Sequence, residues 1–124
     1  MNFDTTYLPM QTGLHIVGEL YTEDSTVLTD LNSTKPKISS AISKVGFNQV
    51  GFTGYSFEGG GYTLVFLLAE SHVSVHTWPE YGYATLDVFV CNVTKNNSDC
   101  AIELFDIIVK MFDPIKLVKR SLLR

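Results

Sequence analysis

Several signatures of particular protein classes are missing from this sequence. No stretch approaches the apolar length of a membrane span, and residues 1–10 carry no run of positive charge that would begin a secretion signal. Lysine and arginine are scattered except near the C-terminus, and the formal net charge is -4. Without a basic patch to attract phosphate groups, nucleic acid is not an expected partner. We therefore expect a cytoplasmic protein that binds neither membrane nor nucleic acid.

Cysteine is also scarce, and its spacing argues against two kinds of site. Cys91 and Cys100 lie nine residues apart, with no Cys-x-x-Cys motif and no nearby pair of histidines. We expect neither a metal site nor a disulfide framework, but reduced thiols. Repeats, low-complexity tracts and linkers are missing as well, so residues 1–124 are expected to form one domain. A domain of this size buries roughly two-thirds of its unfolded surface, and an uncovered sheet face would favour self-association.

Runs of β-forming residues make up much of the sequence. They predict strands at residues 13–22, 47–57, 62–70, 72–78, 83–91 and 115–123. The four middle strands follow one another too closely for helical crossovers, so we expect antiparallel pairing. Residues 59–61 and 79–82 have the composition of turns.

Two segments have helical spacing. Residues 25–45 predict helix with an interruption near residues 33–36, where Pro36 should break the pattern or start a second helix. A later helix is expected to begin with Ser98 as its N-cap and to end at Asp113. These elements predict an α+β fold in two layers, an antiparallel sheet with helices packed on one face. The other sheet face would then be exposed to water or covered by a partner.

The densest chemistry lies in residues 70–91, which read ESHVSVHTWPEYGYATLDVFVC. The segment holds two histidines, a cysteine, hydroxyls and three acids. An ordinary strand hairpin with polar residues on its solvent face has the same composition, so composition alone names no reaction.

The order of these residues resembles a known motif. E-S-H, three further residues and H-T-W-P-E-Y-G-Y are similar to the self-processing segment of the short prokaryotic S-adenosylmethionine decarboxylases. The sequence GLHIVGELY at residues 13–21 is similar to that family's first strand, and the likeness continues to Cys91. The resemblance therefore covers most of the domain.

The resemblance implies a proenzyme that cuts itself between Glu70 and Ser71, leaving a β chain of residues 1–70 and an α chain of residues 71–124. Ser71 would become a pyruvoyl group, whose ketone forms a Schiff base with the substrate amine and accepts electrons as carbon dioxide leaves. The implied product is decarboxylated S-adenosylmethionine, the aminopropyl donor for spermidine. Two such αβ pairs would form a dimer, with residues from both protomers at each site.

The resemblance also implies residues for self-cleavage. His76 matches the histidine that takes a proton from the serine α-carbon, and Thr63 stands where the family usually has a serine that supports the oxyanion-like intermediate. A hydrogen-bonded strand histidine and a β-forming threonine are the structural alternatives. Ser71 and His76 would point to opposite faces of a regular strand, so we predict a bend or bulge near residues 72–74.

Three further residues are implied in binding and decarboxylation. Cys91 matches the donor that returns a proton to the substrate α-carbon, Glu80 matches the acid that accepts hydrogen bonds from the ribose, and Phe57 matches an aromatic that stacks on adenine. A small buried cysteine and a core phenylalanine are the alternatives for Cys91 and Phe57.

Two other functions stay open. The processing motif reports cofactor formation rather than specificity, so the substrate could instead be ornithine or arginine. From a different class of protein, an uncleaved and non-catalytic homologue could serve as a partner subunit, although Ser71, His76 and Cys91 are intact.

Overall fold

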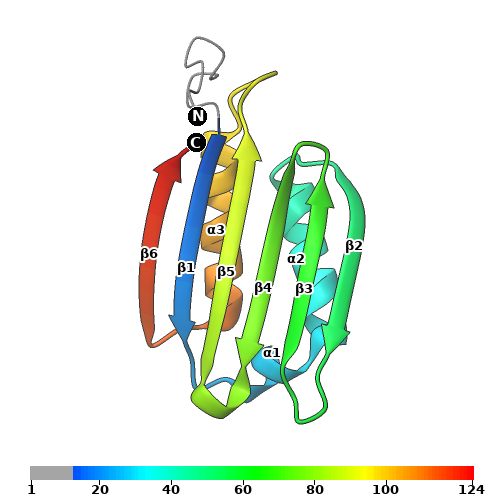
Figure 1. Cartoon of the computed structure of the whole chain (residues 1–124), viewed down its shortest axis with the longest axis vertical. Helices are drawn as coiled ribbons and strands as arrows, with labels where there is room; N and C mark the ends of the chain where they lie inside the picture. Colours follow the sequence, from blue (N-terminus) through cyan, green and yellow to red (C-terminus); the bar gives the residue numbers. More distant parts are fainter. Residues whose placement is uncertain (1–12) are drawn as a thin grey trace, which may run out of the picture.

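The computed structural model describes residues 13–124, and strands and helices form two layers within them (Figure 1). Six antiparallel strands are ordered β2-β3-β4-β5-β1-β6 across one sheet. All three helices lie on the same face of the sheet (Figure 1). The expected α+β fold and antiparallel pairing are therefore confirmed. The strands are β1 (Gly13–Tyr21), β2 (Gln49–Ser56), β3 (Tyr62–Leu68), β4 (Ser71–Trp78), β5 (Tyr83–Cys91) and β6 (Lys116–Leu123).

The central strands alternate strictly between a buried and a half-buried side. Apolar side chains on the buried side, such as Ile16, Val75 and Leu86, are at most 1% exposed and pack beneath the helices. The other side, called here the open face, carries a mixture of polar and apolar groups, including Val17, His76 and Asp87. The alternation of period two thus divides each strand between a core side and the open face.

The helices are α1 (Ser25–Thr29), α2 (Leu31–Lys44) and α3 (Ser98–Phe112). One face of α3 is buried at the helical spacing of three and four residues, through Ala101, Leu104, Phe105, Ile108 and Phe112. Phe105 lies so close to β1 that a Cβ added to Gly18 would be 2.7 Å from its ring. Gly18 therefore lets helix and sheet approach each other.

Two expected features of the helices are wrong in position. The first helical region is interrupted at Asp30 rather than near Pro36, because the Asp30 carboxylate accepts a hydrogen bond from Ser33 N and caps α2. Pro36 lies inside α2. Ser98 is the first residue of α3 rather than its N-cap, which is Asn97. The Ser98 hydroxyl instead accepts a hydrogen bond from the Asn92 amide at 2.9 Å.

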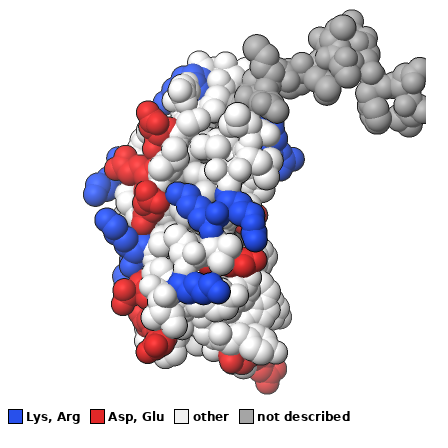
Figure 2. All heavy atoms as spheres, turned by 90° about the vertical axis from the view of Figure 1, so that its left-hand side faces the viewer, with Lys and Arg blue, Asp and Glu red and all other residues white. Residues whose placement is uncertain are grey.

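Strand β6 forms one edge of the sheet, beside β1. Lysine and arginine side chains lie over this edge with acidic side chains next to them (Figure 2). Lys119 Nζ is 3.6 Å from an Asp106 carboxylate oxygen on α3. Charged side chains of this kind discourage a sheet edge from pairing with another chain. No helix within residues 13–124 is both long enough and apolar enough to cross a membrane.

Candidate active site

The expected cleavage point lies at the tight turn between β3 and β4. Leu68 pairs with Ser71, so Ala69 and Glu70 form the two residues of the turn, and Ser71 begins β4. The Ser71 hydroxyl accepts a hydrogen bond from the backbone N–H of Cys91 at 3.2 Å. We call Glu70, Ser71 and Cys91 the cleavage-site cluster. It places the Ser71 hydroxyl beside the backbone of Cys91, whose side chain lies on the open face.

Asn97 fixes the backbone of this cluster from the loop that follows β5. Its side-chain amide donates to the Cys91 carbonyl at 2.8 Å, and its own N–H donates to the Asn92 side chain at 2.6 Å. Asn97, Glu70 and Ser71 line a cavity of about 250 Å³. Sequence reasoning did not find Asn97, because its role depends on the loop folding back onto the end of β5.

The bulge expected near residues 72–74 is wrong. Strand β4 pairs residue by residue with β3 from Ser71 to His76, and with β5 from His72 to Trp78. The sheet ladder on both sides keeps β4 regular. Ser71 therefore shares its side of the sheet with Val73 and Val75, while His76 lies on the open face. His76 is also five positions along the strand from Ser71, a distance of about 17 Å.

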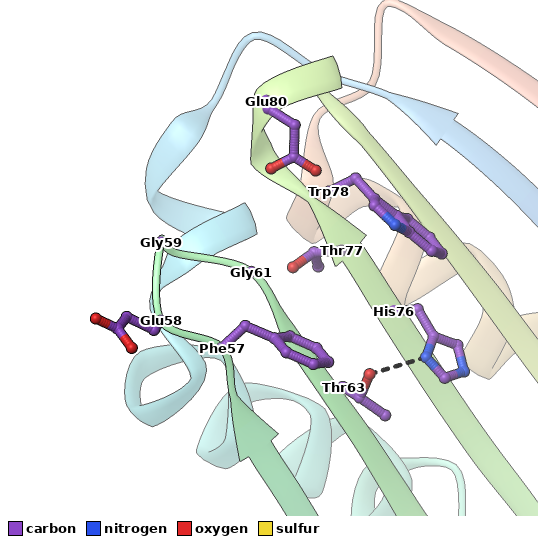
Figure 3. A pocket seen from close by; sticks show the side chains of 9 residues that line it. All are labelled: Phe57, Glu58, Gly59, Gly61, Thr63, His76, Thr77, Trp78 and Glu80. Carbon is purple, nitrogen blue, oxygen red and sulfur yellow. Dashed lines mark hydrogen bonds between the residues drawn. The ribbon is translucent and has the colours of Figure 1, made fainter.

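The remaining predicted residues meet at the opposite end of the strands. They line a cavity of about 350 Å³, which we call the hairpin-end pocket. Figure 3 shows Phe57 reaching from the end of β2 toward Thr63, while Glu58 points away. The lining residues are Phe57, Glu58, Gly59, Gly61, Thr63, His76, Thr77, Trp78 and Glu80.

Thr63 and His76 make direct contact in this pocket. They are paired across β3 and β4, and Thr63 Oγ1 is 2.9 Å from His76 Nδ1 (Figure 3). Both side chains are half-buried. If His76 Nδ1 carries the proton and donates to Thr63, then Nε2 is free to accept a proton. The Thr63 hydroxyl hydrogen then stays available to a third group.

Phe57 and Glu80 lie on turns at the pocket rim. Phe57 is 50% exposed, so the alternative of a core phenylalanine is wrong. Its ring lies 5.0 Å from that of Tyr55 in a T-shaped pair. Glu80 lies in the short helix η2 (Pro79–Tyr81), and its carboxylate is directed toward the pocket in Figure 3. An aromatic face and a carboxylate are thus available to a flat, hydroxyl-bearing ligand.

Buried hydrogen bonds hold the floor of the pocket. The Thr77 hydroxyl donates to the Leu28 carbonyl at 2.7 Å and accepts from Tyr62 N–H at 2.9 Å. The Tyr62 hydroxyl donates to the Val27 carbonyl at 2.8 Å. Burial raises the pKa of Tyr62 to about 12, so the hydroxyl keeps its proton. These bonds fasten α1 to β3 and β4 beneath the pocket.

Glycine is required where the β2–β3 turn crosses β4. A Cβ added to Gly61 would lie 2.8 Å from the Thr77 carbonyl oxygen. Gly59 and Gly60 have φ angles of 103° and 119°, which side chains rarely adopt. The turn can therefore press against β4 and close the pocket. Sequence reasoning had read these glycines as a turn, but it missed the pocket residues Thr77 and Trp78.

A cluster of titratable groups occupies the open face between the two sites. His15 Nε2 is 3.4 Å from Asp87, and the rings of His15 and His72 lie 6.3 Å apart. Burial, followed by the nearby His15, lowers the pKa of His72 from its ordinary value, and Arg124 acts in the same direction. Within residues 13–124 no three side chains of metal-binding type come together.

Comparisons with known proteins place this arrangement in a family. The family model described as S-adenosylmethionine decarboxylase matches residues 14–124. The S-adenosylmethionine decarboxylase proenzyme of Picrophilus torridus is 36% identical over 112 residues, which are 90% of this chain and 83% of the relative. An arginine decarboxylase proenzyme of Hyperthermus butylicus is 40% identical over 89 residues, 70% of this chain and 61% of that relative.

A solved structure has the same fold. The crystal structure of the adenosylmethionine decarboxylase of Aquifex aeolicus matches with a TM-score of 0.82 and 31% identity, over 91% of this chain and 90% of that one. The fold and these comparisons together define a decarboxylase of the type made as a proenzyme. The chain belongs to the S-adenosylmethionine decarboxylase family.

Proposed function

We propose that this protein is a pyruvoyl-dependent decarboxylase of S-adenosylmethionine, formed by self-cleavage between Glu70 and Ser71. The observation that carries the proposal is the grouping of the predicted residues. Ser71 and Cys91 are joined by a hydrogen bond, and Thr63, His76, Phe57 and Glu80 surround a cavity of about 350 Å³. The product would be decarboxylated S-adenosylmethionine, the aminopropyl donor for spermidine.

Self-cleavage begins with the Ser71 hydroxyl. Its oxygen attacks the Glu70 carbonyl carbon, the Glu70–Ser71 C–N bond breaks, and the amide becomes an ester. Thr63 then donates a hydrogen bond to the oxyanion that forms at the Glu70 carbonyl, while it accepts one from His76. His76 Nε2 removes the Ser71 α-proton, so that the ester eliminates, releases the Glu70 carboxylate and leaves dehydroalanine at position 71. Dehydroalanine tautomerises to an imine, and water hydrolyses the imine to the pyruvoyl group with release of ammonia. The chain is thus divided into residues 1–70 and 71–124.

The two clusters come from different copies of the chain in this proposal. Within one copy His76 is about 17 Å along β4 from Ser71 and on the other side of the sheet. A second copy that packs on the open face brings its own His76 and Thr63 to the β3–β4 turn at the end of the first copy's sheet, where the Glu70–Ser71 bond lies. A twofold axis makes the two composite sites equivalent. The active enzyme is therefore a dimer of αβ pairs.

The residues of the cleavage-site cluster suit a pyruvoyl group. Ser71 is the residue from which it forms, and Ser71 stands at the first position of a strand, where the new chain end stays anchored by the sheet. The pyruvoyl ketone supplies the electron sink for loss of carbon dioxide. Cys91 then donates a proton to the substrate α-carbon. Phe57 stacks on the adenine, and Glu80 accepts hydrogen bonds from the ribose hydroxyls.

Mass spectrometry of the purified protein under denaturing conditions tests the cleavage. We expect two chains that divide at Glu70–Ser71, and carbon dioxide release from S-adenosylmethionine. Ser71→Ala should stay one folded, inactive chain of 13.8 kDa. A wild-type chain that remains whole after long incubation would instead favour a non-catalytic partner subunit. Activity retained in Ser71→Ala would refute the pyruvoyl mechanism.

Mixed dimers test whether the site is shared between copies. His76→Ala alone should stop at the ester, which hydroxylamine cleaves between Glu70 and Ser71. When His76→Ala and Ser71→Ala chains are expressed together, the second supplies His76 to the first, so part of the His76→Ala chain should be processed. We expect no such rescue if a chain uses its own His76.

Arginine is the second candidate substrate, because the Hyperthermus butylicus relative is named an arginine decarboxylase proenzyme. Phe57 and Glu80 favour the adenosyl substrate, since arginine has neither a purine nor a ribose. Carbon dioxide release should be measured separately with S-adenosylmethionine, arginine and ornithine. Turnover of arginine without turnover of S-adenosylmethionine would replace the proposed substrate and keep the processing chemistry.

A further inference from the structure

The side chain of Asn97 is used in an unusual way for its position. Asn97 is the N-cap of α3, where an asparagine side chain normally accepts a hydrogen bond from an N–H of the first helical turn. Here it makes no such bond, and its amide donates instead to the Cys91 carbonyl at 2.8 Å. The Asn97 N–H donates to the Asn92 side chain at 2.6 Å, which holds the loop in this position. The capping group of the helix is therefore bonded to the end of β5.

This contact lies where the ladder between β4 and β5 stops. The two strands pair only from His72 onward, and the same register would place Glu70 opposite Cys91. In a continued ladder the Cys91 N–H would donate to the Glu70 carbonyl, and the Cys91 carbonyl would accept from the Glu70 N–H. Glu70 belongs instead to the turn between β3 and β4. Two side chains take its place, because the Cys91 N–H donates to the Ser71 hydroxyl at 3.2 Å and the Cys91 carbonyl accepts from Asn97.

The Asn97 amide therefore determines what the Cys91 N–H can bind. On the Cys91 carbonyl it occupies the position that the Glu70 N–H would take in a continued ladder. Glu70 then stays in the turn, and the Cys91 N–H stays directed at the Ser71 hydroxyl. An N–H donor at this oxygen holds the nucleophile in one position and stabilises the negative charge that grows on it as its proton leaves.

We propose that Asn97 is a positioning residue for self-cleavage, which acts through the Cys91 backbone on the Ser71 hydroxyl. The inference rests on the proposed function and goes beyond it, because it assigns the group that holds the nucleophile before the attack. In that step the Ser71 oxygen bonds to the Glu70 carbonyl carbon, the C–N bond breaks, and the hydroxyl proton passes to the Ser71 nitrogen. Asn97 bonds to the Cys91 carbonyl rather than to a reacting atom, so it affects the rate of this step and not the proton transfer by His76.

The rate of self-cleavage in substituted full-length chains tests this assignment. Asn97→Ala should lengthen the half-time of the uncut chain on the order of 10-fold, the rate equivalent of one neutral hydrogen bond. The matched control is Asn96→Ala in the same loop. The Asn96 side chain accepts a hydrogen bond from Ser98 N–H at 3.0 Å and does not line the cavity beside Ser71. We expect Asn96→Ala to be cut at a rate within about 2-fold of wild type.

The dependence of the rate on pH separates positioning from a general effect on folding. Asn97→Asp keeps the shape of the side chain, but at neutral pH it replaces the donor by a carboxylate that repels the Cys91 carbonyl. Protonation restores a donor, so the cleavage rate of Asn97→Asp divided by the wild-type rate at the same pH should rise at least about 5-fold from about pH 8 to about pH 5. Asn96→Asp places the same charge in the loop, and its ratio should change less than about 2-fold. Circular dichroism at each pH verifies that every chain compared is folded.

The possible outcomes distinguish this inference from the proposed function. A wild-type chain that is cut while Asn97→Ala is cut equally fast would overturn the inference alone. Equal slowing by Asn96→Ala and Asn97→Ala would assign the effect to the loop as a whole, and would overturn it too. The same holds if the ratio for Asn97→Asp is as flat with pH as the ratio for Asn96→Asp. A wild-type chain that stays whole would overturn the proposed function, and this inference with it.

Discussion

In the proposed mechanism, the contact between Thr63 and His76 combines two tasks of self-cleavage in a pair of side chains. Thr63 Oγ1 and His76 Nδ1 are hydrogen-bonded at 2.9 Å. With His76 Nδ1 as the donor, as in the proposed mechanism, Thr63 keeps its own hydrogen for another acceptor. The proposed mechanism uses the Thr63 hydroxyl for both tasks and makes no use of the threonine methyl. The serine that the resemblance implies for the family at this position has the same hydroxyl.

Substitutions at Thr63 should separate these contributions. Thr63→Val keeps the shape but removes the hydroxyl, and should slow self-cleavage on the order of 100-fold, the effect of losing one oxyanion donor. Thr63→Ser keeps the hydroxyl and should process at least as fast as wild type. The half-time for disappearance of the full-length chain measures both. Wild-type processing by Thr63→Val would remove Thr63 from the mechanism.

His72 makes the stability of the protein depend on pH. Burial and the neighbouring His15 lower its pKa in the folded protein below 6.5, with Asp87 opposing and Arg124 adding to the shift. The unfolded chain therefore binds a proton at a higher pH than the folded chain does. The contribution of His72 to stability is fully present above pH 6.5 and is lost as the pH drops from there through the folded pKa.

The variant His72→Gln should lose the part of this pH dependence that comes from His72. We expect its melting temperature to fall less than that of wild type between about pH 7.5 and about pH 5.5, because glutamine takes up no proton. Thermal unfolding followed by circular dichroism at both pH values provides the comparison. An equally large fall in both proteins would assign the acid sensitivity to other groups.

At the scale of elements, the regular strand β4 determines how the site is assembled. Hydrogen-bonded neighbours on both sides leave no space for an extra residue, so the odd spacing between Ser71 and His76 keeps them on opposite faces. The same ladder brings Thr63 directly opposite His76. A bulge would have broken that pairing, and would have separated His76 from the group that orients it.

The bonds between α1 and the strands below the pocket should be measurable. Tyr62→Phe removes the buried hydroxyl that donates to the Val27 carbonyl, and should lower the free energy of unfolding by about 1–2 kcal/mol. Tyr81→Phe makes the same chemical change on a side chain that is 74% exposed, and should have an effect near zero. Urea denaturation of both variants measures the difference. Equal effects would show that the Tyr62 bond is not stabilising.

At the scale of the molecule, the helices cover one sheet face and leave the other, the open face, without a covering layer. The open face mixes apolar groups such as Val17 and Val65 with charged groups such as Glu19 and Arg120. Most of them are only partly exposed. A second copy on this face would bury the apolar groups and complete both active sites.

Introducing a charge on the open face should disrupt this association. Val65→Lys places an ammonium group where the second copy would pack, and should give a folded monomer with little self-cleavage, because burial of an unpaired charge is costly. Ile102→Lys is the matched control on α3, where the side chain is 41% exposed on the helix layer. Sedimentation velocity and the fraction of cleaved chain measure the result. A Val65→Lys dimer that processes normally would place the interface elsewhere.

Much of the fold was predictable because local patterns and the final structure agree. Buried and half-buried residues alternate along residues 83–91, and the residues from Ala101 to Phe112 that have helical spacing are buried on one face of α3, as the sequence predicts. The errors lie where competing local signals met. The Asp30 carboxylate caps the start of α2, so the helix begins before Pro36 and contains it. The Asn92 side chain donates a hydrogen bond to the Ser98 hydroxyl, the group that the sequence predicts as the cap of α3. Which of two neighbouring polar groups caps a helix depends on distances in the folded protein, and the spacing of residues in the sequence does not give these distances.

The sequence by itself determined the two-layer fold and the family motif, because the period of apolar residues and the order of side chains from Glu70 to Cys91 are written in it. Only the tertiary structure decided how these residues are grouped. It joined Ser71 to Cys91, and Phe57 and Thr63 to His76, as two separate clusters. The physical reason is strand pairing, since hydrogen bonds with β3 and β5 determine the sheet face of every side chain on β4 and its position along the strand.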